Sequence, residues 1–337
     1  MQRWGITFPL DGVSLRAHRE VLREMEAIGY TDAWTAEVDG PDAFTPVTLA
    51  AAWTERIRLG TAIASVFTRT PTVLAQTAWA VSEAAQGRFC LGIGSSSPAI
   101  VESWNGVPFQ QPLTRVRDTV SFLRQVFAGE KARSEPFGVR GFRYARRSAP
   151  PPPIFIAALQ KKMLALAGSA GDGVIINWLG ANDVPKVVQV AKDAARAAGR
   201  DPDALEVVAR IFVIPTTNDA LVRLLGRRAI AGYLTTPVYS AFHRWLGRGA
   251  AFRPMQEAWQ SGDRQSATEL VPDAALEDLF VTGDAHACIE GIEAYCRAGV
   301  TVPVINIMPT VQDPGDLGER NIAVMRELAA GVRRFLR

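Results

Sequence analysis

The chain has 337 residues, a length that suits one large α/β domain or two ordinary ones and allows a substantial buried core. Apolar residues make up 48% and charged residues 21%, which is typical of a globular enzyme and excludes a disordered or fibrous chain. The net charge is +3, and basic residues are scattered except at residues 140–147, which we interpret as a solvated loop rather than a nucleic-acid site.

The amino terminus enters an apolar, strand-like run directly, with no pattern typical of a signal peptide. No uncharged run reaches membrane-spanning length. The cysteines, Cys90, Cys288 and Cys296, lack metal-ligand spacing with the histidines, so they are interpreted as structural thiols. We therefore expect a cytoplasmic protein with no metal site and with neither nucleic acid nor membrane as a partner.

Apolar strand-like runs alternate with helical patterns through the first half of the chain. The expected strands are residues 4–10, 32–37, 57–64 and 88–94. The expected helices are residues 15–28, 46–54, 71–86 and 113–127. Residues 131–153 are rich in arginine, glycine and proline, which predicts an excursion across the surface.

The alternation resumes after this excursion. The expected strands are residues 154–158, 173–177, 205–214 and 302–307. The expected helices are residues 161–170, 184–198, 286–298 and 318–336. Residues 216–272 are mostly helical in pattern and longer than a connection needs, which indicates an insertion.

Eight strands that alternate with helices predict an α/β fold, a (β/α)8 TIM barrel with insertions after strands four and seven. We expect it to form a single domain over residues 1–337. A doubly wound open sheet is the second interpretation. In a barrel, the active site lies at the carboxyl ends of the strands, so residues that follow each strand are the candidates for function.

The fourth expected strand ends in a loop of small polar residues. Gly92 and Gly94 precede Ser95, Ser96 and Ser97, which leave backbone N–H groups and hydroxyls available to an anion. The spacing fits neither the dinucleotide fingerprint nor the P-loop, so a plain strand-to-helix turn is an equal interpretation of the motif alone. Its place after the fourth strand of a barrel favours anion binding.

The other expected strand ends carry little acid–base chemistry. They include no Cys–His pair, no Ser–His–Asp motif and no metal cluster, and their one pair of carboxylates is Glu37 with Asp39. Such a site suits a cofactor that brings its own reactivity. Glu37 itself either faces a ligand or is a solvated group near a helix start.

Several motifs occur in family order, and although each is modest, the ordered set is specific. They are residues 36–46, 56–63 with 68–71, 87–94, 108–109 with 112–115, 154–159 and 167–174. Together they span most of residues 1–180, with a weaker echo at 281–283 and 298–300. On these motifs the chain resembles the luciferase-like monooxygenase superfamily, in particular its branch of oxidoreductases that use the deazaflavin coenzyme F420.

The resemblance implies a barrel that holds the deazaflavin ring at its carboxyl mouth. A backbone bulge after strand three, often a non-proline cis peptide, supports the ring in the family and maps to Ala62 and Ile63. The side-chain phosphate maps to the serine loop, and the acidic ring contact maps to Glu37. The complete set of cofactor-binding residues that the resemblance implies is Glu37, Ala62, Ile63, Ser65, Ser95, Ser96, Ser97, Ala157, Ala158 and Leu159.

The chain departs from the family pattern at two places. Val38 stands where dehydrogenases of sugar phosphates or alcohols commonly have a histidine, which disfavours a dehydrogenase of that kind. Gln160 and Lys161 stand where Gly-Pro is common, so the geometry on the phosphate side is expected to differ.

The leading hypothesis is an oxidoreductase that transfers a hydride between coenzyme F420 and an unidentified small organic substrate. Asn177, Trp178 and Asn306 are expected to shape the substrate side, although ordinary packing is an equal interpretation of Trp178. No catalytic residue is assigned, and His243 is a distant candidate for the proton donor. The alternatives are an FMNH2-dependent monooxygenase that binds FMN and a non-catalytic cofactor-binding homologue. Apolar residues 71–86 and the family's habit of pairing barrels favour a homodimer.

Overall fold

The computed structural model describes residues 3–145, 149–311 and 313–335, and its centre is a closed parallel barrel. Neighbouring strands pair in chain order, and the ring closes where β12 pairs with both β10 and β1. The barrel strands are β1 (Gly5–Thr7), β2 (Asp32–Thr35), β3 (Arg58–Thr61), β5 (Phe89–Gly94), β8 (Ile154–Ala157), β9 (Gly173–Asn177), β10 (Glu206–Ile214) and β12 (Val302–Ile307). The predicted TIM barrel is confirmed, and the open sheet is wrong.

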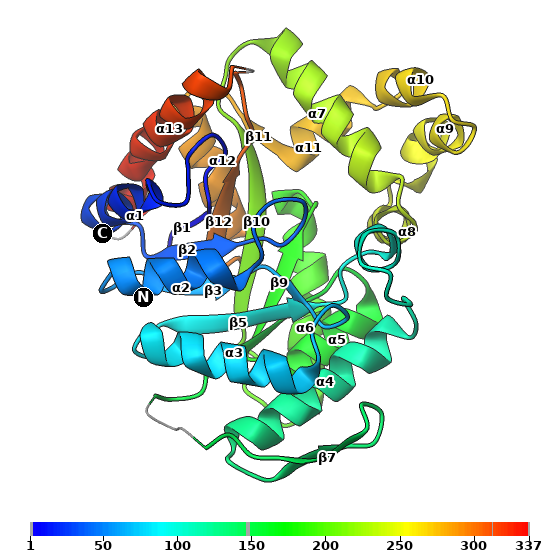
Figure 1. Cartoon of the computed structure of the whole chain (residues 1–337). Coiled ribbons are helices and arrows are strands. Elements are labelled where there is room, and N and C mark those ends of the chain that lie inside the picture. Colours follow the sequence, from blue (N-terminus) through cyan, green and yellow to red (C-terminus); the bar gives the residue numbers. More distant parts are fainter. Residues whose placement is uncertain (1–2, 146–148, 312, 336–337) are drawn as a thin grey trace.

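Helices form a layer around the barrel (Figure 1). They are α1 (His18–Ile28), α2 (Phe44–Trp53), α3 (Pro71–Ala84), α4 (Pro112–Phe127), α5 (Lys161–Ala170), α6 (Val184–Ala197), α12 (Ala285–Arg297) and α13 (Pro314–Phe335). In α1, the apolar stripe Val21, Leu22 and Met25 is buried. Gly29 then ends the helix at φ 110°, a left-handed conformation that glycine adopts without steric cost.

Several boundaries differ from the expected ones for local reasons. α2 begins before Pro46, because a carboxylate oxygen of Asp42 accepts hydrogen bonds from the backbone N–H groups of Phe44 and Thr45. The third expected strand is split into β3 and a short strand β4 (Ala64–Ser65), which pairs with β5. The break falls at Ala62 and Ile63.

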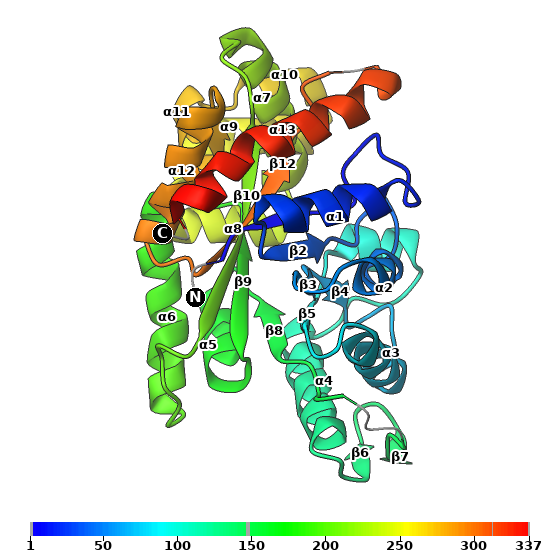
Figure 2. The same ribbon diagram turned by 90° about the vertical axis from the view of Figure 1, so that its left-hand side faces the viewer.

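Two insertions extend the barrel in opposite directions, as Figures 1 and 2 show. After α4, the surface excursion contains an antiparallel hairpin of β6 (Ala132–Ser134) and β7 (Val139–Phe142), which was not predicted. Residues 140–142 of the basic segment lie in β7, while residues 146–148 fall outside the described residues.

After β10 the chain forms a helical insertion that continues to Leu279, beyond the expected end at residue 272. Its helices are α7 (Asp219–Leu234), α8 (Pro237–Leu246), α9 (Gly249–Gln260), α10 (Arg264–Glu269) and α11 (Asp273–Leu279). A missed three-residue strand, β11 (Phe280–Thr282), then pairs with the outer end of β10. That the whole chain forms one domain stays a prediction.

The amino end of the barrel interior is closed by a charged floor. Arg58 on β3 donates to Asp32 at 2.6 Å and to Glu206 at 2.8 Å. Above the floor, Trp34 and Phe155 meet edge to face with ring centroids 5.6 Å apart. A side chain at Gly60 would overlap the Trp34 ring, so glycine is required there. The opening of the barrel is therefore its carboxyl mouth.

The remaining sequence-based expectations concern thiols and membranes. All three cysteines are free, and burial raises the pKa of each thiol to about 12, so each is protonated at neutral pH. Among the helices of the described residues, none combines the length and apolar character that a membrane span requires.

Candidate functional site

Polar side chains line one half of the inner face of the mouth. Thr7 ends β1, Asn306 lies near the end of β12, Arg210 is on β10, and Asn177 ends β9. These four strands are neighbours. Side chains along each strand point alternately into and out of the barrel, and these four residues occupy inward positions. We call Thr7, Asn306, Arg210 and Asn177 the polar arc.

The members of the polar arc are held by hydrogen bonds. One guanidinium nitrogen of Arg210, Nη2, donates to Asn306 Oδ1 at 2.6 Å. The side-chain amide of Asn177 donates to the hydroxyl of Tyr239, on insertion helix α8, at 3.3 Å. The arc therefore joins the barrel mouth to the helical insertion.

The opposite half of the mouth is built from small and apolar residues. A Cβ added to Gly94 would lie 3.1 Å from Ala157 Cβ and 3.2 Å from Ile63 Cδ1, so these residues from different strands meet at one place. The peptide bond between Ala62 and Ile63 is cis, as the resemblance implied. We call Ala62, Ile63, Gly94 and Ala157 the apolar half.

A cavity of about 400 Å³ opens at the carboxyl ends of β1, β2 and β12. This volume is in the range of small-molecule sites. Three members of the polar arc line it, and the residues Asp11 and Asp39 line its solvent-exposed side. Partial burial and the neighbouring Asp39 raise the pKa of Asp11. The full lining is Thr7, Phe8, Pro9, Leu10, Asp11, Gly12, Val13, Leu15, Ala36, Val38, Asp39, Gly40, Pro41, Arg210, Tyr233, Asn306, Ile307 and Asn321.

Arg210, like Thr7, is a site residue that was not predicted from the sequence. Its pKa is lowered because burial disfavours the charged form. At Arg58, burial acts in the same direction, but the carboxylates of Asp32 and Glu206 outweigh it and raise the pKa. The signal that could have revealed Arg210 is a single cation at an inward position near the middle of an apolar strand.

The carboxylate of Glu37 is hydrogen-bonded to neighbouring segments of the chain. Its two carboxylate oxygens accept hydrogen bonds from Arg69, each at 2.6 Å, and one also accepts from the backbone N–H of Ser65 at 3.4 Å. The side chains of Glu37 and Arg69 are only 19% and 18% exposed, so solvent screens the ion pair weakly. This arrangement ties the end of β2 to β4. A contact between Glu37 and a cofactor ring stays a prediction.

The remaining predicted cofactor residues lie around the apolar half. Ser65 is 3% exposed, and its hydroxyl oxygen accepts a hydrogen bond from the backbone of Phe67. Ser95, Ser96 and Ser97 are half-buried directly after β5, and Ser96 has φ 61°. The serine loop leads into a π-helix, η1 (Ala99–Trp104).

The segment after β8 contacts the helical insertion. Ala157 and Leu159 are half-buried, whereas Ala158 is only 2% exposed. Gln160 donates a side-chain hydrogen bond to a backbone carbonyl of α8 at 3.4 Å, and the Lys161 ammonium lies 5.7 Å from the ring centroid of Trp245. The two residues that depart from the family pattern therefore lie against α8.

The structure does not bring Trp178 into the cavity with Asn306. Trp178 is 1% exposed and packs on Phe212 with ring centroids 4.3 Å apart, inside the core of the insertion. His243 is also fully buried in the insertion, and burial, together with nearby Arg248, lowers its pKa to about 3. His243 is not among the residues that line the cavity, so the structure does not bring it to the mouth.

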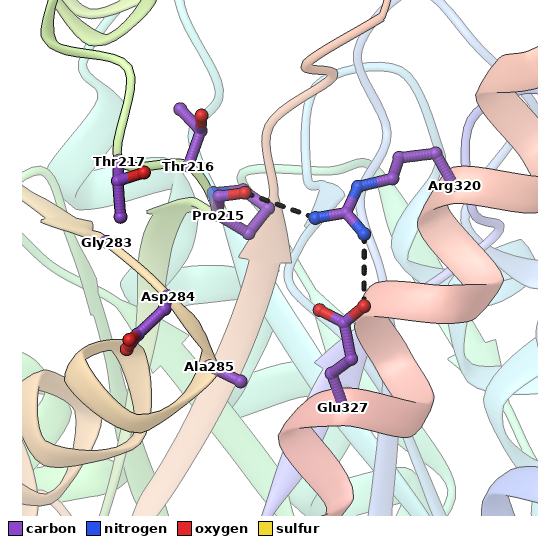
Figure 3. Close-up of a pocket in the computed structure, with 8 residues that line it drawn as sticks. All are labelled: Pro215, Thr216, Thr217, Gly283, Asp284, Ala285, Arg320 and Glu327. Carbon is purple, nitrogen blue, oxygen red and sulfur yellow. Dashed lines mark hydrogen bonds and ion pairs between the residues drawn. The ribbon is translucent and has the colours of Figure 1, made fainter.

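A second hollow of about 290 Å³ lies between the chain after β10, the turn before α12, and α13 (Figure 3). Arg320 donates to the carbonyl of Pro215 at 3.3 Å and pairs with Glu327 at 3.0 Å. Arg320 and Glu327, the charged residues that α13 contributes to this hollow, are therefore paired. The contacts fasten α13 to the end of β10, which is a structural role.

The fold and the mouth define a (β/α)8-barrel protein with a cavity in the volume range of small-molecule sites. The amino-acid sequence also matches a family model. It is the luciferase-like monooxygenase model, which matches residues 6–302, and the chain belongs to this family.

Named relatives and solved structures cover nearly the whole chain. The 5,10-methylenetetrahydromethanopterin reductase of Methanolobus tindarius is 32% identical over 303 residues, which are 88% of this chain and 92% of the relative. The coenzyme F420-dependent tetrahydromethanopterin reductase of Methanopyrus kandleri has the same fold, with TM-score 0.78, 22% identity and 99% of both chains covered. A type II Baeyer-Villiger monooxygenase of Pseudomonas putida, solved in complex with FMN, has TM-score 0.67, 18% identity and 98% of both chains covered.

Proposed function

We propose that the protein is an oxidoreductase that transfers a hydride between coenzyme F420 and a small organic substrate. The observation that carries this proposal is the division of the barrel mouth into an apolar half and a polar arc. A flat ring packs on the apolar half, and a polar substrate faces it from the arc. The coenzyme F420-dependent reductase of Methanopyrus kandleri, which has the same fold, supports F420 as the coenzyme.

The residues present fit a deazaflavin coenzyme. The small side chains of Ala62, Gly94 and Ala157 leave a surface on which a ring can lie flat. The half-buried Ser95, Ser96 and Ser97 offer hydroxyls to a phosphate beside the same strand end. When bound, the coenzyme supplies the ring carbon that gives or accepts the hydride.

The protein's contribution is position and a dry site. The ion pair of Glu37 with Arg69 fixes the segment that carries Ser65 and the apolar half. The packed rings of Trp34 and Phe155 fill the barrel interior between the mouth and the charged floor, and they exclude water from that side of the site. Asn177 and Asn306 then orient the substrate from the polar arc.

The second candidate is an FMN-dependent monooxygenase, which the FMN complex of the Pseudomonas putida enzyme supports. Titrating the purified protein with F420 and with FMN, followed by fluorescence, separates the two. We expect F420 to bind at least ten-fold more tightly than FMN. Tight FMN binding without F420 binding would refute the proposal.

Turnover is the second test. The F420-loaded protein is assayed in both directions against a panel of alcohols and electrophilic acceptors, with the absorbance of the coenzyme as readout. Saturable F420 binding without turnover on any member of the panel would favour a non-catalytic homologue instead.

We also propose that the protein forms a homodimer. α3 buries Leu74, Ala78 and Trp79 against the barrel but leaves Val73 49% exposed, so an apolar side chain remains on its outer face. Light scattering coupled to size-exclusion chromatography tests this, and a monomer at micromolar concentration would refute it.

A further inference from the structure

We propose that Arg210 and Thr7 form a subsite for a carboxylate group of the substrate, with Asn306 as the residue that positions Arg210. This inference rests on the proposed function and deepens it, because it identifies the substrates as small organic acids.

The Arg210 side chain is half-buried, its Nε is fully buried, and no carboxylate within the described residues pairs with it. Within residues 3–145, 149–311 and 313–335, its one hydrogen bond is to the neutral Asn306, and its Nε is buried with no acceptor. Two other arginines that are shielded from solvent differ, since Arg58 pairs with two carboxylates and Arg248 pairs with Asp183 and Asp278. A buried charge without a counter-ion is costly, and an anionic ligand removes that cost.

Thr7 supplies an independent observation on the adjacent side of the cavity. Its hydroxyl oxygen is also buried, with no partner in the part of the chain that the structure describes. Thr7 and Arg210 flank Asn306 across the neighbouring strands β1, β12 and β10, and all three line the same cavity. A planar group with two acceptor oxygens can take hydrogen bonds from both donors at once, which a carboxylate does well.

Asn306 fixes the direction in which Arg210 faces. Its Oδ1 accepts a hydrogen bond from Arg210 Nη2 at 2.6 Å, and its own amide nitrogen lies 3.9 Å from the sulfur of Met308. The Arg210 guanidinium also lies 5.6 Å from the ring centroid of Phe212. The guanidinium is thus held before a ligand arrives, so little side-chain entropy is lost on binding.

The position of the subsite favours substrate over coenzyme. The serine loop, where the proposed function places the coenzyme phosphate, follows β5, whereas Arg210 lies on β10 across the mouth. Asp11 and Asp39 on the solvent-exposed side of the cavity repel an anion there. An acidic substrate is therefore directed with its carboxylate at Arg210 and its neutral end toward the apolar half.

The test compares crotonate with crotonamide, which have the same carbon skeleton and differ in charge. Binding is measured by calorimetry, with and without F420, for the wild type and for Arg210→Met, Arg210→Lys and Thr7→Val. The control is Arg196→Met, because this arginine side chain is 61% exposed on α6. Circular dichroism reports whether each variant is folded.

We expect the wild type to bind crotonate at least ten-fold more tightly than crotonamide. Arg210→Met should weaken crotonate binding by about 10- to 100-fold, the range for a charge-assisted hydrogen-bonded pair. Arg210→Lys should retain part of the preference, Thr7→Val should lose a smaller factor, and Arg196→Met should match the wild type. If Arg210→Met is unfolded, the Arg210→Lys and Thr7→Val results decide.

Equal affinity for the acid and the amide in the wild type, including no binding of either, would overturn the subsite. So would an Arg210→Met protein that loses F420 affinity but keeps crotonate affinity, because Arg210 would then contact the coenzyme. Failure of the wild type to bind F420 would instead refute the proposed function, while the preference for crotonate over crotonamide would still decide the subsite.

Discussion

His243 allows a pH dependence of stability to be worked from the structure. The side chain is fully buried, with Phe242 and Phe252 ring centroids 5.5 Å and 5.3 Å away. Burial, and then the charge of Arg248, lower its pKa from the ordinary 6.5 to about 3. Between these two values the unfolded chain binds a proton that the folded chain does not, so stability falls as the pH falls below 6.5.

The size of the effect follows from the gap in pKa. Each pH unit below 6.5 costs about 1.4 kcal/mol until the folded pKa is reached, so the wild type loses about 2 kcal/mol from this group between pH 7.5 and pH 5. Replacing the imidazole in His243→Leu removes this contribution. We expect the loss of stability on acidification to be smaller by about 2 kcal/mol in the variant.

Urea unfolding at pH 7.5 and pH 5, followed by tryptophan fluorescence, measures the effect. Each variant is compared with itself at the two pH values, so any packing defect from the substitution cancels. His286→Gln is the control, because the side chain of His286 is 72% exposed. The reasoning is refuted if His243→Leu loses as much stability on acidification as the wild type.

Three further predictions concern the mouth of the barrel. Glu37→Gln should weaken F420 binding about ten-fold in a fluorescence titration while the fold is retained, because a charged hydrogen-bonded contact of the segment after β3 is lost; unchanged affinity would contradict this. Gly92→Ala should lower the free energy of unfolding by about 3 kcal/mol in urea, because its Cβ would overlap the carbonyl oxygen of Thr61, whereas Gly232→Ala, in open space, serves as the matched control. Ser96→Gly should keep the wild-type stability, whereas Ser96→Val should lose stability by about 1–2 kcal/mol because a β-branched residue resists φ 61°; equal melting temperatures for the two variants would argue against this.

Much of the barrel could be predicted because buried parallel strands are nearly continuous apolar runs. The bounds of β9, β12 and α5 agree with residues 173–177, 302–307 and 161–170. β11 was missed because three residues carry too little pattern to be recognised. The start of α2 was missed because it depends on the Asp42 side chain, which precedes the apolar residues of the helix.

The site was less predictable, because its contacts join residues far apart in the sequence. The partner of Glu37 is 32 residues away, and the partner of Arg210 is 96 residues away. Thr7 and Arg210 lie three and four residues before the ends of the expected strands 4–10 and 205–214, whereas the predicted residues Asn177 and Asn306 lie at or beside a strand end. The burial of Trp178 depends on the packing of the insertion, which no local pattern reveals.

The charged floor of the barrel has a consequence for the order of events in a catalytic cycle. Arg58, Asp32 and Glu206 close the amino end of the barrel. Two ligands that meet inside the barrel must therefore both enter and leave through its carboxyl mouth. The ligand that reaches deeper must arrive first and depart last. Steady-state kinetics with product inhibitors should therefore follow a compulsory sequence, with the order set by which ligand lies nearer the floor.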